Sequence, residues 1–408
     1  MNTGYLSFIK QNAPFLATGA LLSFMSSFGQ TFFISIFGGE IRETYGMSNG
    51  DWGVIYMFST MASAFVMIFA GGLADIFRVR TLGILVATGL AFGSLAMAYS
   101  TNLASLIVVI FALRFLGQGM ATHMSAIAMS RWFIATRGRA LAVAGLGFML
   151  AEATLPLTMV WLKTLIEWRT LWIYFAVFCI AMAPVLYMLL RLERTPQSEA
   201  QVNSSTGLLG KHWTRSEALS HPLFWLIVPA IVSFAAFGTV FWFHQAYFAT
   251  VKGWTHLSLV AVFPLGTIAL ALSTIGYGWA IDRFGVVRLL PFYILPYVAA
   301  FVINWYAPTL IWTAGAVILM GIAGGGHTTI INAVWADFYG TRYIGSIKSA
   351  ATALMVLGSA LGPGISGWLI DANVGIEIQL LAYAGVFAIC AVLLGLAARM
   401  ARALSAAA

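Results

Sequence analysis

Charged residues are scarce in this 408-residue sequence: they make up only 8% of it, against ~25% in soluble domains. Acidic residues are the rarest, with 13 Asp and Glu against 21 Lys and Arg. A soluble chain of this length needs far more charge to cover its surface, so a soluble fold is excluded. Hydrophobic residues make up 61%, and 40 glycines accompany them. Small residues let membrane helices approach closely, so we expect an all-α membrane protein.

The motifs of enzymes and metal sites are also missing. The two cysteines, Cys179 and Cys390, lie in apolar runs and provide neither a disulfide framework nor metal spacing. There is no phosphate-binding loop, zinc motif or nucleophile elbow. We therefore predict that the protein is not an enzyme and uses no cofactor or metal.

Long apolar stretches predict twelve membrane-spanning helices, since crossing the hydrocarbon core takes ~20 residues. The predicted spans are 14–38, 51–73, 82–100, 104–130, 140–162, 168–190, 222–249, 257–281, 289–306, 309–335, 344–370 and 378–399. The first is too long for a cleavable signal, and Lys10 is its only early cation. An even number of spans puts both termini on one side.

The distribution of basic residues predicts the orientation. Sixteen Lys and Arg fall on the side of the termini, and Arg114 lies within a helix. The opposite side has only Arg42, Lys163, Arg169 and Lys252. This bias predicts a multi-pass protein of the cytoplasmic (inner) membrane with both termini in the cytoplasm. It also accounts for the net charge of +8 without a nucleic-acid partner.

The two halves of the chain share a pattern. Gly71-Gly-Leu-Ala-Asp75 returns 207 residues later as Gly278-Trp-Ala-Ile-Asp282. The same offset relates Gly117 to Gly324, Gly119 to Gly326, Gly138 to Gly345 and Pro156 to Pro363. The only long polar stretch lies between the halves, which predicts a bundle over 1–190, a cytoplasmic linker over 191–220 with a short helix near 208–219, and a second bundle over 221–408. Paired membrane halves are typical of secondary transporters.

These features resemble the major facilitator superfamily. The two Gly-to-Asp loops, Arg114-Phe-Leu-Gly-Gln-Gly119 and Gly358-Ser-Ala-Leu-Gly-Pro363 match its motifs. The resemblance implies two pseudo-symmetric bundles of six helices, with helices 1, 4, 7 and 10 lining a central cavity that opens to each side in turn. It also implies a cytoplasmic conformational latch made of Asp75, Arg80, Asp282 and Arg283.

A narrower resemblance covers helices 4 to 6. Arg131-Trp-Phe133, Arg137-Gly-Arg-Ala140 and Trp168-Arg169 look like the monocarboxylate and oxalate/formate transporter branch. That branch moves small organic anions, often with a proton. Helix 8 lacks the cation that often completes the anion site in such relatives.

Arg114 and Glu152 are the charged residues placed deep within predicted spans. At 100° per residue, Gln118, Thr122 and Ser125 share the helix face of Arg114. Arg114 is either a contact for a substrate anion or a buried arginine bonded to backbone carbonyls. Glu152 is either a proton carrier, since burial favours a neutral carboxyl, or the partner of Arg114 in a permanent ion pair.

Further candidates for substrate binding are the polar residues of helices 1, 7 and 10. They are Gln30, His244, Gln245, His327 and Asn332. His244 and His327 are also candidates for proton coupling. His244 shares an aromatic face with Phe234 and Phe241, and His327 follows three glycines that weaken its helix. The alternative for each is a packed, satisfied polar group.

We therefore expect a monomeric, proton-coupled carrier of a monocarboxylate-like organic anion, acting as a symporter or an antiporter. Its partners are a small-molecule substrate, membrane lipid and a proton gradient. The main alternative is a proton-driven efflux pump for drugs or amphipathic metabolites, favoured by the kink at Pro363 and the aromatic helix 7. A membrane sensor and a channel are less favoured.

Overall fold

The computed structural model describes residues 5–71, 73, 77–133, 136–191 and 206–406, and within these residues the chain forms helices and no strands. Ten helices are long and apolar enough to cross a membrane. The bent pair Ala13–Gly29 and Thr31–Tyr45 and the shorter apolar helix Leu295–Tyr306 complete a one-to-one match with the twelve predicted spans. The all-α membrane fold predicted from composition is therefore confirmed.

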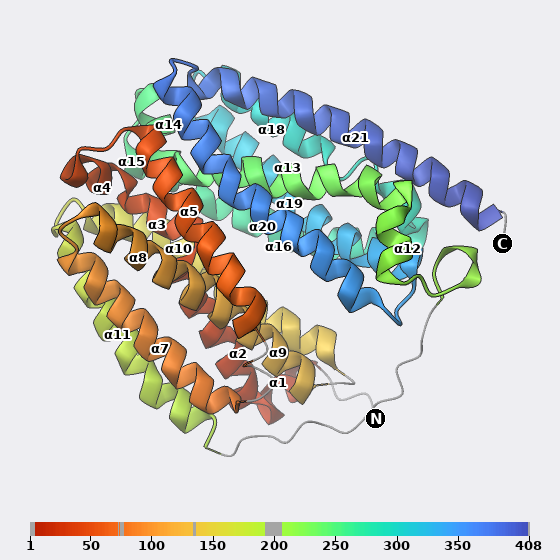
Figure 1. The fold of residues 1–408 in the computed structure, drawn as a ribbon, viewed down its shortest axis with the longest axis horizontal. Helices are drawn as coiled ribbons and strands as arrows, with labels where there is room; N and C mark the ends of the chain where they lie inside the picture. Colours follow the sequence, from red (N-terminus) through yellow and green to blue (C-terminus); the bar gives the residue numbers. More distant parts are fainter. Residues whose placement is uncertain (1–4, 72, 74–76, 134–135, 192–205, 407–408) are drawn as a thin grey trace. The chain divides into compact units, whose positions relative to one another are not determined.

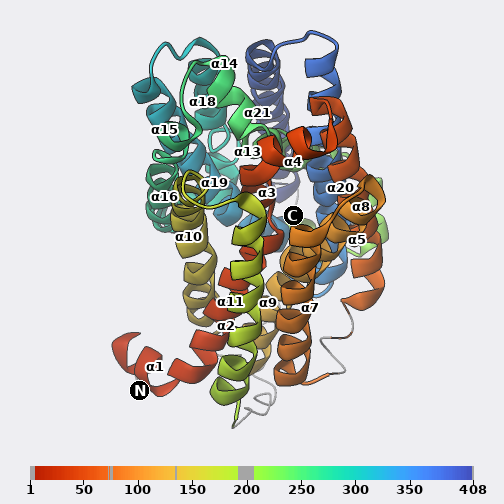
Figure 2. The ribbon, with the colours of Figure 1, turned by 90° about the vertical axis from the view of Figure 1, so that its left-hand side faces the viewer.

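Contacts between residues group the chain into two compact units, of which unit 1 contains residues 1–47 and 55–202. Its first half contains α1 (Tyr5–Gln11), α2 (Ala13–Ser26), η1 (Ser27–Gly29), α3 (Thr31–Ile34), η2 (Ser35–Phe37), α4 (Gly38–Tyr45) and most of α5 (Asn49–Ala70). Its second half contains α7 (Val79–Tyr99), α8 (Leu103–Leu113), η3 (Arg114–Ala121), α9 (Thr122–Trp132), α10 (Arg137–Leu162) and α11 (Trp168–Leu189). Helices α7 and α11 lie side by side, and α10 packs along α2 (Figures 1 and 2).

Unit 2 contains residues 48–54 and 203–408. Its elements are η4 (Leu208–Gly210), α12 (Arg215–Ser220), α13 (Pro222–Phe243), α14 (Gln245–Val251), α15 (His256–Val260), α16 (Phe263–Phe284), α17 (Val286–Leu289), α18 (Leu295–Tyr306), α19 (Leu310–Tyr339), α20 (Ile344–Asp371) and α21 (Ile376–Ala406). The most extensive helix pairing joins α16 and α19. A Cβ on Gly321 would lie 2.1 Å from the carbonyl oxygen of Gly266, so this pairing depends on glycine.

The starts of the helices repeat at the offset found in the sequence. Helices α5 and α15 begin at Asn49 and His256, and α8 and α19 begin at Leu103 and Leu310. Each pair of starts is 207 residues apart, as are the starts of α7 and α17 and of α10 and α20. The repeat therefore extends to the spacing of helix starts, and it supports two related halves.

Large apolar side chains are strongly exposed within each unit. Ile68 and Met188 are 72% and 73% exposed in unit 1, and Ile275 and Ile311 are 73% and 83% exposed in unit 2. A soluble protein rarely exposes so much contiguous apolar surface. Exposure of this kind fits helices that are surrounded by lipid.

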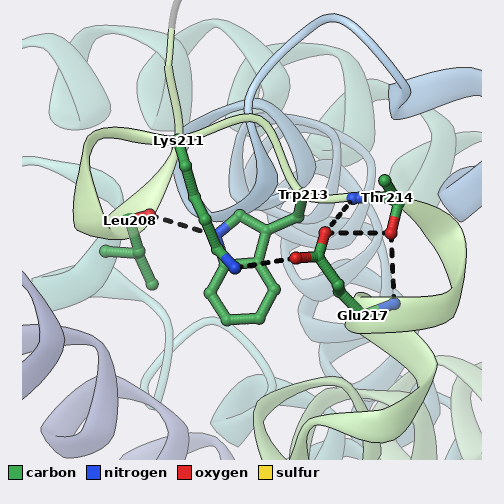
Figure 3. A network of polar contacts seen from close by, with 5 residues as sticks. All are labelled: Leu208, Lys211, Trp213, Thr214 and Glu217. Atoms are coloured by element: carbon green, nitrogen blue, oxygen red, sulfur yellow. Dashed lines mark hydrogen bonds and ion pairs between the residues drawn. The ribbon is translucent and has the colours of Figure 1, made fainter.

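The predicted linker is partly described. Residues 192–205 lie outside the described residues, and the expected short helix is present as two pieces, η4 and α12. Figure 3 shows that the Trp213 indole donates to the Leu208 carbonyl (3.0 Å), while Lys211 pairs with Glu217 (2.9 Å). Thr214 and Glu217 form a reciprocal capping box at the start of α12.

This network lowers the pKa of Glu217 to about 2, mainly because the backbone N–H of Thr214 donates to the carboxylate. The backbone N–H of Trp213 also donates to the Tyr339 carbonyl at the end of α19 (3.0 Å). The segment after the linker is therefore fixed to the last turn of that helix.

Candidate functional site

The first membrane segment is broken at Gln30. Helix α2 continues into the 3-10 turn η1, Gln30 adopts an extended conformation (φ −84°, ψ 154°), and α3 then begins at Thr31. The two parts of the segment differ in direction by 50°. An extended residue interrupts the helical hydrogen-bond ladder, so carbonyl groups near the break need other donors. The sequence predicted one continuous helix over 14–38, and that prediction is wrong at Gln30.

A second irregular element packs against the break. Residues Arg114–Ala121 form the π-helix η3, a wider turn that often occurs at functional sites. A Cβ on Gly29 would lie 2.0 Å from the Leu113 carbonyl oxygen, and one on Gly117 would lie 2.6 Å from the Gly29 nitrogen. Only glycine at both positions allows this backbone contact.

Arg114 connects the two irregular elements. Its Nη1 donates to the Gly29 carbonyl (3.0 Å) and to Thr31 Oγ1 (3.4 Å), so it satisfies a carbonyl at the break. The Tyr56 ring lies below the guanidinium, with 5.2 Å between Cζ and the ring centroid, and the Tyr56 hydroxyl is 2.6 Å from Thr31 Oγ1. The residue is only 1% exposed.

The other edge of the Arg114 guanidinium is buried and unpartnered. Within the described part of the chain, Nε and Nη2 have no hydrogen-bond partner, and no acidic residue pairs with Arg114. Buried N–H groups without partners are rare in folded proteins. Nη1 thus bonds to backbone as one of the predicted alternatives had it, and a contact between Arg114 and a substrate anion stays a prediction.

The polar stripe predicted on helix 4 is only partly present. Gln118 is half-buried and Thr122 is exposed, but Ser125 is buried and bonds to Gly19 O and Ser23 Oγ, both at 2.8 Å. The prediction assumed 100° per residue throughout. The π-helix turns less per residue, so positions after Ala121 are rotated relative to that assumption.

Glu152 lies on α10, which packs along α2. Its side chain is half-buried and has no hydrogen bond or ion pair with any described residue, so the predicted alternative of a permanent Arg114 pair is wrong for this structure. One turn earlier on the same face, Phe148 contacts Phe32, two residues after the break (centroids 5.8 Å apart). Glu152 thus lies on the side of α10 that faces helix 1.

The far end of α10 is tied to the second half of the broken segment. Lys163 Nζ is 2.6 Å from Glu40 Oε1 and 2.5 Å from the Ile36 carbonyl oxygen. Burial lowers the pKa of Lys163, although the neighbouring Glu40 carboxylate opposes this shift. The pair fixes the position of η2 and α4 against the end of α10.

The sequence did not identify Thr31 and Tyr56 as site residues. Tyr56 is an isolated tyrosine in an apolar stretch, and Thr31 directly follows Gln30. Each is a lone polar group in a membrane segment, and this was the sequence feature that could have identified them as site residues. Their contact with Arg114 depends on the break at Gln30, which no residue pattern indicated.

The candidates of helix 7 in unit 2 lie at a second break. His244 separates α13 from α14 (φ −94°, ψ 19°), and both His244 and Gln245 are buried. The Gln245 Oε1 atom is 3.4 Å from His256 Nε2. The predicted aromatic face continues across His244, since the rings of Phe241 and Phe248 are in contact (centroids 5.7 Å apart).

His327 is buried among aromatic rings in unit 2. It stacks on Phe234 with 3.9 Å between centroids, and its Nδ1 is 3.4 Å from the Tyr293 hydroxyl. The preceding glycines do not break α19, since that helix is continuous from Leu310 to Tyr339. A Cβ on Gly325 would meet Ser273 Oγ at 2.0 Å, so the glycines serve close packing with α16.

Asn332 is exposed near the end of α19. Its Nδ2 donates to the Thr328 carbonyl (2.6 Å), and Lys348 Nζ donates to its Oδ1 (2.6 Å). Trp335, three residues further along α19, is buried between Phe224 and Tyr339.

The predicted latch residues are only partly described. Asp75 lies outside the described residues, and the Arg80 guanidinium lies over the Tyr187 ring (5.4 Å). Asp282 and Arg283 are exposed in the last turn of α16 and form no ion pair with another described residue. The latch stays a prediction. No group of three metal-ligating side chains occurs within the described ranges.

The chain matches a known family over most of its length. The family model described as "Major Facilitator Superfamily" matches residues 19–355 and 267–405. The chain therefore belongs to the Major Facilitator Superfamily, and the predicted fold of two six-helix halves is confirmed. The chain is thus a multi-pass membrane protein of this family.

Solved structures agree on the fold. A bacterial homolog of the human lysosomal transporter Spinster superposes with a TM-score of 0.71 at 16% identity, covering 96% of this chain and 98% of that one. The nucleoside transporter NupG gives 0.62 at 16% identity, with 96% and 98% covered. The human organic anion transporter MFSD10 gives 0.64 at 14% identity, with 94% and 99% covered. At such identities the likeness concerns the fold alone.

The curated relatives match only a short segment. Multidrug resistance protein B homologs from two strains of Mycobacterium tuberculosis (CDC 1551 / Oshkosh and ATCC 25618 / H37Rv) are 32% identical over 115 residues. That segment is 28% of this chain and 21% of those proteins. The narrower resemblance to the monocarboxylate branch therefore stays a prediction.

Proposed function

We propose that this protein is a secondary active transporter that carries a small, carboxylate-bearing organic anion by alternating access. The single observation that carries the proposal is the buried, unpartnered Nε–Nη2 edge of Arg114. In a guanidinium these two nitrogens present parallel N–H groups, the geometry that binds both oxygens of one carboxylate. The Nη1 atom donates to the Gly29 carbonyl, and this bond fixes the orientation of the guanidinium.

The break in helix 1 supports a binding role at this point. Transporter sites commonly lie where a membrane helix is discontinuous, because free backbone groups and polar side chains become available there. Gln30 and Gln118 are half-buried beside this break and can bond the remaining polar groups of a substrate. The other predicted contacts, His244, Gln245, His327 and Asn332, stay candidates in unit 2.

Glu152 is the proposed proton carrier. It lies on the side of α10 that faces the broken segment, and no described cation holds it in the charged form. Low dielectric disfavours an unpaired carboxylate, so protonation depends on whether water reaches the group. Alternate exposure to the two sides would then couple a proton gradient to substrate movement.

Orientation and location are part of the proposal. The sixteen cations on the side of the termini support cytoplasmic termini in the inner membrane. On the opposite side, Lys163 and Lys252 each pair with an acid, Glu40 and Glu377 respectively. We propose a monomer as the working unit.

The test compares an acid with its uncharged isostere. Purified protein in proteoliposomes under a pH gradient is given lactate or lactamide, which differ in the carboxylate. Uptake of lactate, or of another monocarboxylate in a wider panel, without uptake of the matching amide is expected. Equal transport of acids and amides would contradict the role assigned to Arg114.

A drug exporter is the second candidate. The 115-residue match to multidrug resistance proteins favours it, as does the buried aromatic cluster around Phe241 in α13. In the same vesicles an exporter would move amphipathic dyes against their gradient and ignore monocarboxylates. That outcome would replace the organic-anion proposal.

A further inference from the structure

The charge of Arg114 has no counter-ion within the described part of the chain. The side chain is 1% exposed, Glu40 is engaged by Lys163, and Glu152 makes no ion pair. The Tyr56 ring and the Gly29 carbonyl are neutral groups that orient the guanidinium without cancelling its charge.

Such a charge needs compensation in every state of the carrier. An isolated buried ion costs several kcal/mol even after relaxation of its surroundings. When the organic anion has left, the guanidinium stays buried with two unpartnered N–H groups.

The geometry points to a small inorganic anion of the chloride class as the second occupant of this site, bound at the Nε–Nη2 edge whenever the organic substrate is absent. This inference rests on the proposed function. Both unpartnered groups at this edge are hydrogen-bond donors on a cation, which suits an anion and not a cation. The enclosure of the side chain favours a monatomic ion over a bulky one. Chloride would therefore compete with the carboxylate.

The test is competition in the wild-type protein. Binding of a transported monocarboxylate is measured in detergent by calorimetry, while chloride replaces the larger methanesulfonate at constant ionic strength and pH. The apparent Kd is expected to rise linearly with chloride, by ~tenfold when chloride reaches ten times its own dissociation constant. Chloride alone should also raise the thermal unfolding midpoint in a saturable way. An apparent Kd and a midpoint that do not respond to chloride would overturn the inference.

Two variants locate the effect. Arg114→Gln should remove the chloride dependence of the midpoint, while Arg169→Gln should retain it, because the Arg169 guanidinium is bonded to the Ala98 and Ser100 carbonyls. Retention of the full chloride response in folded Arg114→Gln would overturn the assignment to this site.

The two proposals fail differently. Monocarboxylate binding that ignores chloride would overturn the chloride site and leave the transport proposal standing. A saturable chloride response at Arg114 without binding of any carboxylate would support the anion site and contradict the proposed substrate class.

Discussion

The two units share a repeat of helix starts but differ in the chemistry placed on it. At the offset of 207 residues, Arg114 corresponds to Gly321, Tyr56 to Phe263, Gln30 to Phe237 and Glu152 to Ser359. Every polar member of the unit 1 site has a small or aromatic counterpart in unit 2. The duplicated backbone therefore places charged and polar side chains in unit 1 where unit 2 has small or aromatic ones.

Helices 4 and 10 show the difference most directly. Both run for 30 residues, as Leu103–Trp132 and Leu310–Tyr339. The first contains a π-helix that begins at Arg114, whereas the second stays α-helical and packs Gly321 against Gly266. A cation in the first helix and a glycine in the second thus accompany two different helix geometries.

The largest expected effect comes from substitution of glycines at close backbone contacts between helical elements, a feature that both units share. Gly29→Ala places a Cβ 2.0 Å from the Leu113 carbonyl oxygen, and Gly321→Ala places one 2.1 Å from that of Gly266. Neither backbone can move away cheaply, so each variant should lose ~3 kcal/mol or more of stability. The thermal unfolding midpoint in detergent measures this loss. Gly39→Ala, where the new Cβ meets nothing within 4 Å, is the control and should be neutral.

Charge recognition should be confined to unit 1. Arg114→Gln removes the two N–H groups proposed to bind the carboxylate. Each charge-assisted hydrogen bond contributes ~1.5 kcal/mol, so the loss of both is expected to weaken carboxylate binding ~100-fold. His327→Gln changes the matching helix of unit 2, where the imidazole is packed on Phe234, and should alter binding by less than ~threefold. Isothermal titration calorimetry measures the dissociation constant of the carboxylate for each variant. Comparable losses would show that the site extends equally into both units.

Proton coupling should follow the same asymmetry. Glu152→Gln is expected to abolish the ~tenfold accumulation that one pH unit drives through one coupled proton, while substrate exchange continues. Its counterpart, Ser359→Ala, removes a hydroxyl that donates to its own helix at Val356 and should leave accumulation unchanged. Substrate uptake into vesicles, measured with and without a pH gradient, distinguishes coupled accumulation from exchange in each variant. Unchanged accumulation in Glu152→Gln would remove that residue from the mechanism.

The smallest effect concerns the segment that caps unit 2 after the linker. The pKa of Glu217 is lowered to about 2 from its ordinary value of 4.5, so the charged form is favoured by folding. Its contribution is complete above pH 4.5 and is lost as the pH falls toward 2. Glu217→Gln should lower the thermal midpoint by ~2 °C at neutral pH, and the difference should disappear in acid. A difference that persists in acid would show that the charge is not its cause.

Much of the fold could be predicted because it depends on apolar length. The α10, α11 and α20 spans agree with prediction to within a few residues, since each is one uninterrupted apolar helix. The breaks at Gln30 and His244 were not predicted, because neither residue is a helix breaker and tertiary contacts at Gly29 and Gly117 allow the first of them. Local propensity does not report such contacts.

The candidate site was predicted less completely. Arg114, Gln30 and Glu152 were found because polar groups are rare within membrane segments, and the structure brings Arg114 to the break beside Gln30. Which edge of Arg114 is unpartnered could not be predicted, since it depends on the position of one carbonyl oxygen. His327 is also a polar residue within an apolar membrane segment. In the structure it is buried among rings, because aromatic neighbours from distant segments surround it.

The ungapped repeat gives equivalent segments of the two halves the same length, so residues 103–132 and 310–339 begin and end at equivalent points. Equal length does not make the two segments exchangeable. A transplanted first segment would bring its arginine to position 321, where even a Cβ would lie 2.1 Å from the Gly266 carbonyl oxygen. Divergence of the two copies has therefore committed each segment to its own half.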